Sequence, residues 1–284
     1  MGDNMLENTI NILNKARIEN YAVPQFNINN LEWTKYILES ANDLKLPVIL
    51  GVSEGAINYM GGYNTVVNIV VGLMIDLKIK IPVVLHLDHA SSLESCVKAI
   101  DAGFTSVMID QSSKTLNENI KVTKEVVEYA KNYKVSVEAE VGHIGGKEDN
   151  ISSNIAHAKV KDCIKLVGAT GVDILAASVG SSHGIYDGKP IIKFNLIQEI
   201  RDATNLPLVL HGGSGIPNDT IKKAINSGIA KININTELQV VWTDALREFL
   251  ETNKDIYDPR KVIGSGEKAI KDTIKKIYKL FKTK

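Results

Sequence analysis

The chain alternates eight times between a short β-branched apolar run and a longer stretch with helical periodicity. In the longer stretches, apolar residues recur at i, i+3 and i+4, which is the spacing of one helix face. Parallel strands are usually buried on both faces, so they appear in a sequence as near-continuous apolar runs separated by helices. The runs cover residues 21–26, 46–53, 81–89, 104–110, 135–142, 172–180, 206–213 and 229–236.

Eight such units predict a closed (β/α)8 barrel, the TIM barrel of the α/β class. The competing architecture, an open doubly wound sheet, usually carries a glycine-rich fingerprint after its first strand. Residues 27–33 follow the first run here and contain no glycine. We therefore expect one barrel domain over 1–284, with an extra amphipathic C-terminal helix after residue 258.

Composition narrows the classes of partner. Lysine plus arginine and aspartate plus glutamate balance at 33 each, so no global field draws the chain to nucleic acid or to an anionic membrane. The two cysteines are too few for a disulfide framework, and no apolar run approaches the length of a membrane span. We expect a soluble cytoplasmic protein whose charged partners bind at a local site.

Polar residues are concentrated where the predicted strands end. The active site of a TIM barrel lies at the C-terminal ends of its strands, so residues just after each apolar run are the candidates for chemistry. Five of the six histidines fall at or shortly after such ends. The polar residues at these positions are His86, Asp88, His89, Asp110, Glu138, Glu140, His143, His183 and His211.

Three imidazoles from different strands can converge on one metal ion. Three protein nitrogens and an open fourth position form a catalytic rather than a structural zinc site. The favoured set is His89, His183 and His211. Strand alternation places His86 and His89 on different faces, but alternation alone does not decide which of the two is the ligand.

Segments of small or polar residues follow the last three predicted strands: two are glycine-rich, at 180–184 and 211–215, and the third is the polar segment 233–236. In the first two, small residues let backbone N–H groups approach an anion, and the segment at 211–215 leads into a predicted helix whose N-terminus favours negative charge. Barrels commonly hold phosphate after strands 7 and 8. The sequence therefore predicts a phosphate site beside the predicted metal ligand His211.

An ordered set of motifs carries a family resemblance: HLDHA, SVMID, SVEAEVG, GSSHG, LHGGSG and KININTE. Over residues 22–270 the chain resembles the class II, zinc-dependent fructose-1,6-bisphosphate aldolases. The resemblance implies reversible cleavage of fructose 1,6-bisphosphate to dihydroxyacetone phosphate and glyceraldehyde 3-phosphate, in glycolysis and gluconeogenesis. The alternatives are a tagatose-1,6-bisphosphate or related ketose-bisphosphate aldolase and, more remotely, a non-catalytic barrel that binds sugar phosphates.

The resemblance also implies roles for individual residues. Asp88 matches the acid/base at the C4 oxygen of the substrate, and Glu148, in a glycine-bearing loop, matches the base that moves the dihydroxyacetone phosphate proton. His89 matches the zinc ligand that follows this aspartate, which resolves the choice left open above, and His183 and His211 complete the zinc site. The carboxylates expected to bind a displaced or second divalent ion are Asp110 and Glu140.

Ten further positions match substrate-binding residues of the family, with Arg260 expected at the C6 phosphate. They are Asn27, Ser53, Gly184, Gly212, Gly213, Ser214, Asn233, Asn235, Thr236 and Arg260. Family members also often bind a monovalent cation, Na⁺ or K⁺, and assemble as homodimers or homotetramers. Whether Arg247 reaches a neighbouring subunit is left open by the sequence.

The chemistry agrees with a metal-dependent aldolase. Cleaving a C3–C4 bond next to a ketone leaves a carbanion, which such enzymes stabilise as an enamine on a lysine or as a metal-bound enediolate. Only Lys231 among the lysines ends a strand near the centre of the barrel, so the metal route is favoured. Departures from the family pattern at 111–119, His143 and Asp187 leave the choice between the fructose and tagatose substrates open.

Overall fold

Eight parallel strands close into a barrel in the order β1-β11-β10-β8-β5-β4-β3-β2, which confirms the predicted TIM barrel. The computed structural model describes residues 6–148, 151–153, 155–186 and 188–284, with 147–148 and 151–153 described by their backbone alone. The barrel strands are β1 (Val23–Asn27), β2 (Val48–Ser53), β3 (Val83–Ala90), β4 (Ser106–Ile109), β5 (Ser136–Val141), β8 (Ile174–Ala177), β10 (Leu208–Leu210) and β11 (Ile229–Ile234).

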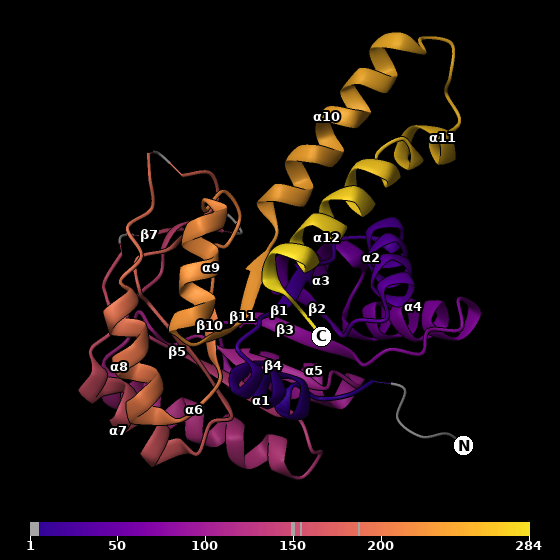
Figure 1. Cartoon of the computed structure of the whole chain (residues 1–284). Helices are drawn as coiled ribbons and strands as arrows, with labels where there is room; N and C mark the ends of the chain where they lie inside the picture. Colours follow the sequence, from indigo (N-terminus) through magenta and orange to yellow (C-terminus); the bar gives the residue numbers. More distant parts are fainter. Residues whose placement is uncertain (1–5, 149–150, 154, 187) are drawn as a thin grey trace.

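Helices surround the barrel and follow its strands in the chain (Figure 1). Side-chain caps fix several of their starts: Asn30, Ser92 and Thr115 each accept a hydrogen bond from a backbone N–H of the first turn. No helix in the described part of the chain is long and apolar enough to cross a membrane. The helices are α1 (Ile10–Glu19), α2 (Leu31–Leu44), α3 (Glu54–Met60), α4 (Tyr63–Asp76), α5 (Leu93–Ala102), α6 (Leu116–Lys131), α7 (Val160–Thr170), α8 (Phe194–Thr204), α9 (Asn218–Ser227), α10 (Thr236–Thr252), α11 (Pro259–Gly264) and α12 (Glu267–Phe281).

The strands are shorter than most of the apolar runs that predicted them; for example, the run 172–180 contains only the four-residue strand β8. A second, three-stranded sheet was not predicted. It pairs β6 (Gly145–Glu148) with β7 (Ile151–Ser153) and with β9 (Ser182–His183). These segments are short and polar, so they lack the apolar signal of the barrel strands.

Alternation along the strands fills the barrel interior. Every second residue of a strand faces inward, and on β3 these are Val84, His86 and Asp88, while Val83 and Leu85 belong to the apolar layer beneath the helices. At the N-terminal end of the barrel the inward residues are apolar. Helix α1 packs on them through Ile12, Leu13 and Ala16, in one buried cluster with Ile49, Val84, Met108, Ile174 and Val209.

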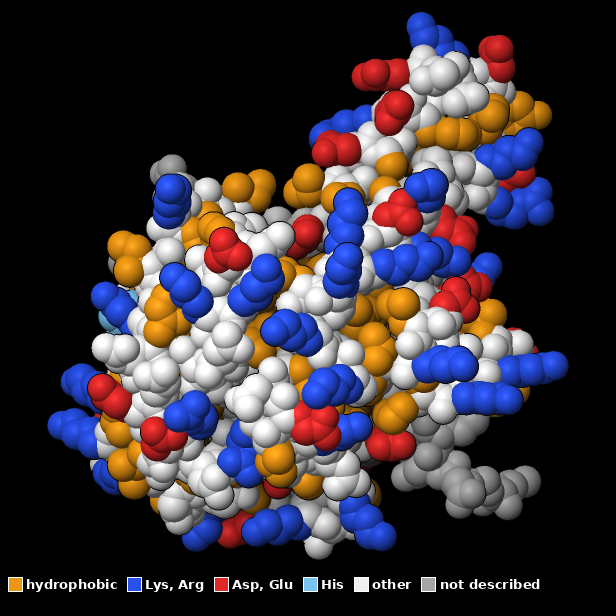
Figure 2. Space-filling model, viewed as in Figure 1, with side chains coloured by type: hydrophobic (Ala, Val, Ile, Leu, Met, Phe, Trp, Pro, Cys, Tyr) orange, Lys and Arg blue, Asp and Glu red, His pale blue; other side chains and the backbone are white. Residues whose placement is uncertain are grey.

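The predicted C-terminal helix, α12, covers the barrel where it closes. Its buried residues include Ile274, Tyr278 and Phe281, and the Tyr278 hydroxyl donates to the carbonyl oxygen of Pro47 at 2.9 Å. The ring of Tyr278 also meets Phe26 of β1 edge to face. Helix α12 therefore occupies the outer position between α2 and α9, and Figure 2 shows basic side chains gathered on its solvent side.

Helix α10 follows the last strand but does not cover the barrel. Leu238 is its one buried residue, and Figure 1 shows α10 and α11 projecting away from the strands before α12 returns to them. The sequence periodicity of 237–251 predicts a helix here and does not reveal its direction, because an amphipathic face has the same spacing whatever surface it packs on.

We predict that α12 stabilises the barrel as a core element. Ile274→Ala removes a fully buried side chain and should lower the free energy of unfolding by about 2–5 kcal/mol. The neighbouring exposed Lys275→Ala should change it by less than about 0.5 kcal/mol. Urea denaturation of both variants measures the difference, and equal stability of the two would contradict the assignment.

Candidate functional site

A β-bulge at the end of β3 sets the first part of the site. Leu87 pairs with Val107 and Ala90 pairs with Ile109, so Asp88 and His89 together oppose one residue of β4. His89 adopts a left-handed backbone conformation, with φ of +50°. The bulge breaks strand alternation, and the side chains of both Asp88 and His89 therefore reach the mouth of the barrel.

The bulge also separates His89 from His86, the other candidate for the metal ligand on this strand. His86 lies one layer deeper and is fully buried, with its Nδ1 atom 2.8 Å from the Ser106 hydroxyl oxygen. His89 instead lies beside the two other predicted ligands. Period-two alternation could not decide between them, because a bulge changes the face of every later residue on its strand.

Three imidazoles meet at the mouth. His89 comes from β3, His183 from β9, and His211 directly follows β10. Their ring centroids are 4.5–5.6 Å apart, and one nitrogen of each lies within 4.8 Å of the others. The structure thus brings together the three histidines that the sequence predicted as zinc ligands.

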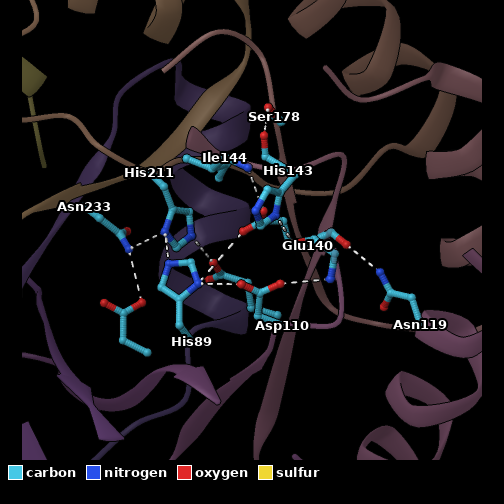
Figure 3. Close-up of polar contacts among 12 residues, drawn as sticks. His89, Asp110, Asn119, Glu140, His143, Ile144, Ser178, His211 and Asn233 are labelled. Atoms are coloured by element: carbon cyan, nitrogen blue, oxygen red, sulfur yellow. Dashed lines mark hydrogen bonds and ion pairs between the residues drawn. The ribbon is translucent and has the colours of Figure 1, made fainter. Parts of the chain in front are cut away.

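Carboxylates behind two of the imidazole rings determine which ring nitrogen carries the proton and which keeps its lone pair. Glu138 Oε1 lies 2.9 Å from His211 Nε2, and Asp110 Oδ2 lies 3.0 Å from His89 Nδ1. With a proton on each of those nitrogens, the remaining nitrogens, His211 Nδ1 and His89 Nε2, face each other 2.9 Å apart (Figure 3). Two facing lone pairs repel each other unless a cation lies between them, so this donor set fits a metal ion.

Burial keeps the imidazoles of His183 and His211 neutral. Burial, followed by the neighbouring His89, lowers the pKa of His183 to about 3, and the same two causes hold the pKa of His211 well below its ordinary value. Metal ligation requires unprotonated imidazole nitrogens. His183 and His211 are therefore in the ligating form at neutral pH.

A second candidate metal group shares His89 with the first. Asp110, Glu140 and His89 offer ligand atoms within 4.8 Å of one another. Burial, followed by the charge of Asp110, raises the pKa of Glu140 to about 8. Its Oε1 accepts from the Ile144 N–H at 3.0 Å (Figure 3). Its Oε2 is buried, lies 4.0 Å from His89 Nδ1 and has no hydrogen-bond partner among the described residues. A cation at this oxygen would be stabilising.

Three amide side chains surround the carboxylate of Asp88. Gln25 and Asn27 both donate to Oδ2, at 2.8 and 3.0 Å, and Asn233 lies 3.4 Å from Oδ1. Although burial opposes the charged form, the nearby histidines and Lys231 hold the pKa of Asp88 below its usual range. The carboxylate is thus ionised at neutral pH, which is the form that can accept a proton.

The glycine-rich segments lie beside this centre, and Gly212 and Gly213 pack too closely against neighbouring residues to carry a side chain. A Cβ on Gly212 would come within 2.1 Å of the Ser182 carbonyl oxygen, and one on Gly213 within 2.4 Å of Ile232. Gly184 and Gly212 both have positive φ, which favours glycine. Backbone N–H groups can approach an anion at such positions, and Asn235 and Thr236 stand at the start of α10, where a helix N-terminus favours negative charge.

Three predicted residues make their described side-chain contacts away from the centre, and the side chain of a fourth is not described. Ser53 caps α3 through its hydroxyl, and the Ser214 hydroxyl accepts from the Glu237 N–H. Arg260 lies on α11 with its side chain 89% exposed and paired with Asp258. Glu148 ends β6, and its side chain lies outside the described residues.

The sequence left three buried polar residues without a role. Gln25 was missed, although it lies two positions before Asn27 and so shares its inward face. Glu138 and Lys231 were noted at strand ends but given no function; Lys231 Nζ donates to Glu138 Oε2 at 2.7 Å, and both side chains are fully buried. Counting inward positions from each predicted site residue would have located all three.

Comparisons with known proteins agree on one family. The family model described as "Fructose-bisphosphate aldolase class-II" matches residues 7–284. A fructose-bisphosphate aldolase of Geobacillus stearothermophilus is 55% identical over 264 residues, covering 93% of this chain and 92% of the relative. One of Staphylococcus aureus is 54% identical over 269 residues, covering 94% of each chain.

A solved structure is similar over almost the whole chain. The crystal structure of the YdjI aldolase from Escherichia coli K12 superposes with a TM-score of 0.85 at 32% sequence identity, covering 98% of both chains. The fold of this chain is therefore similar to that of a solved aldolase over almost its whole length.

We predict that Glu138 strengthens metal binding through His211. Glu138→Gln replaces the buried carboxylate behind the ring and leaves Lys231 without its ion pair. Loss of such a supporting carboxylate typically lowers metal affinity about 10–100-fold. Competition for Zn²⁺ against a coloured chelator measures the change, with the exposed Glu128→Gln as the control. A folded Glu138→Gln protein with unchanged affinity would contradict the prediction.

Proposed function

The chain belongs to the class II fructose-bisphosphate aldolase family, and from that premise we propose that it cleaves fructose 1,6-bisphosphate reversibly into dihydroxyacetone phosphate and glyceraldehyde 3-phosphate. The observation that carries the proposal is the convergence of His89, His183 and His211 beside the carboxylate of Asp88. An acid/base group next to a three-histidine metal site is what cleavage of a carbon–carbon bond next to a ketone needs.

We assign Zn²⁺ to the three histidines because three imidazole nitrogens with an open fourth position suit a catalytic zinc ion. Bound there, the ion would supply Lewis-acid polarisation of the substrate ketone. Glu140 and Asp110 would hold a displaced or second divalent ion. A monovalent cation near the phosphate loops and a cytoplasmic location follow from the family resemblance and stay predictions.

The chain's own residues would move the protons. In cleavage, Asp88 removes the proton from the C4 hydroxyl as the C3–C4 bond breaks, and it returns that proton in condensation. Glu148 protonates C3 of the dihydroxyacetone phosphate fragment. Lys231 is fully buried and paired with Glu138, so the proposal gives it no bond to the substrate.

Backbone and polar groups would hold the substrate phosphates. Gly212, Gly213 and Ser214 lie before α9, and Asn235 and Thr236 lie before α10. Gly184, Asn233, Asn27 and Ser53 complete the predicted set around the sugar. Two helix starts, the first of which follows a glycine-rich turn, would provide N–H donors and partial positive charge for one phosphate group.

Arg260 is proposed to act on a second copy of the chain. It is carried by α11, which packs mainly on α10, and Figure 1 shows these helices projecting away from the barrel. A homodimer or homotetramer in which this projection reaches a neighbour would bring Arg260 to the far phosphate of the neighbour's substrate.

The deciding experiment separates substrate from metal. Purified protein is incubated with fructose 1,6-bisphosphate or tagatose 1,6-bisphosphate, with and without a chelator, and triose phosphate release is followed. We expect chelator-sensitive cleavage that prefers the fructose compound. A preference for the tagatose compound would keep the site and change the substrate, and cleavage of neither by zinc-loaded protein would overturn the proposal in favour of a binding barrel.

We predict that Asp88→Ala retains zinc and loses cleavage. General acid/base groups contribute about 10²–10⁴-fold in rate, so kcat should fall by that factor while the bound zinc stays at the wild-type level. Coupled-enzyme kinetics and metal analysis of the same sample provide both numbers. Wild-type turnover in Asp88→Ala would remove Asp88 from the mechanism.

Subunit complementation tests Arg260. Arg260→Ala and Asp88→Ala are each expected to be weakly active alone. If Arg260 serves its neighbour, random reassembly of a mixed homodimer regenerates one intact site in half of the dimers, or about a quarter of the wild-type activity. Activity that stays at the level of the separate variants, with hybrid formation verified by mass spectrometry, would place Arg260 outside the neighbouring site.

A further inference from the structure

We propose that Gln25 is a positioning residue that fixes the orientation of the Asp88 carboxylate. Neither the motifs nor the substrate positions of the sequence include Gln25. The inference rests on the proposed function, because it matters only if Asp88 handles the proton of the substrate hydroxyl.

The contacts of Gln25 are directed at Asp88. Gln25 lies on β1 with its side chain fully buried, and Nε2 donates to Asp88 Oδ2 at 2.8 Å. The same nitrogen lies 3.3 Å from the side-chain oxygen of Asn27. Its contact is the shortest of the three amide contacts to the carboxylate, so Gln25 makes the tightest of them.

The neighbouring strand leaves room for this side chain. A Cβ on Gly51 of β2 would lie 2.3 Å from Gln25 Nε2 and 2.7 Å from Cδ. Any larger residue at position 51 would displace the amide of Gln25. Gly51 has an ordinary backbone conformation, since its φ is not positive in this structure. The need for a glycine here therefore comes from the space that the Gln25 side chain occupies and not from the backbone conformation.

The buried carbonyl oxygen of Gln25 argues against a purely structural role. Oε1 has no hydrogen-bond partner among the described residues, and a buried unpaired acceptor costs free energy. An apolar residue of the same length would avoid that cost. The amide nitrogen is therefore the group that accounts for a glutamine, and its partner is the proposed acid/base.

Asp88 depends on such a partner because of its position in the bulge of β3. With Gln25 and Asn27 on one oxygen, the second carboxylate oxygen faces Asn233 at the longer distance of 3.4 Å. Loss of the Gln25 contact would let the carboxylate rotate. A displacement of about 1 Å of a reacting group can lower the rate by about a hundredfold.

Gln25→Met tests the role, because methionine has the same length and no N–H donor. We expect kcat for ketose-bisphosphate cleavage to fall roughly ten- to a hundredfold, with KM and bound zinc close to wild type. The matched control is Gln198→Met on the exposed face of α8. Wild-type kcat in Gln25→Met would overturn the proposal.

A partial reaction separates positioning of Asp88 from general damage. Exchange of the dihydroxyacetone phosphate C3 proton with D₂O requires the metal site and Glu148 but no C4 hydroxyl. Gln25→Met should therefore retain exchange, followed by NMR, while it loses cleavage. An equal loss of both would show that the substitution disturbs the whole site and would refute the specific role.

A double-variant series tests the link to Gly51. Gly51→Ala should lower kcat as Gln25→Met does, because it displaces the amide, and it should lower the thermal midpoint. In a Gln25→Ala background the added methyl group meets no glutamine side chain. There, Gly51→Ala should no longer lower the thermal midpoint, while kcat should stay low. Independent effects on the midpoint would contradict the proposed contact.

The crystal structure of Gln25→Met keeps the inference testable if the proposed function fails. If wild-type protein cleaves neither ketose bisphosphate, the function is wrong, and the orientation of Asp88 in the variant then decides the positioning claim by itself. A rotated Asp88 carboxylate would support it, and an unmoved one would overturn it.

Discussion

The pairing of buried charge inside the barrel is the constraint on which the site depends. Glu138 lies on the barrel axis side of β5, where an unpaired carboxylate would be very costly. It shares its two oxygens between Lys231 of β11 and His211 after β10. These contacts join three strands. The Glu138 carboxylate, whose buried charge must be paired, therefore also fixes the His211 ring that we assign to the metal.

The interior of a barrel is usually apolar, and here the polar side chains are confined to separate layers along the barrel axis. The N-terminal layer is apolar and closed by α1, and the middle layer holds Glu138, Lys231 and His86. The layer at the mouth holds Asp88 and the three predicted zinc ligands. Because residues i, i+2 and i+4 of a strand face inward, each layer packs directly on the one below it. Rigid support below a site keeps its side chains within the narrow geometry that catalysis requires.

The sequence predicts the barrel and most of the site because the signals are periodic. Eight apolar runs locate the strands, and residues that follow them, such as Asp110 and His211, lie at the mouth as expected. The assignment of His89 needed the family resemblance, because the bulge at Asp88–His89 has no periodic signature. The direction of α10 and the small sheet formed by β6, β7 and β9 depend on tertiary contacts of short or exposed segments, which local patterns do not encode.

The pairing of β6 with β9 has a mechanical consequence. Gly146 opposes His183, so closely that a methyl group on Gly146 would overlap the His183 carbonyl oxygen. The strand that leads to Glu148 is thus paired, through its backbone, with the strand that carries His183, one of the proposed metal ligands. A displacement of β6 would therefore move His183 with it, so we expect the two strands to shift together.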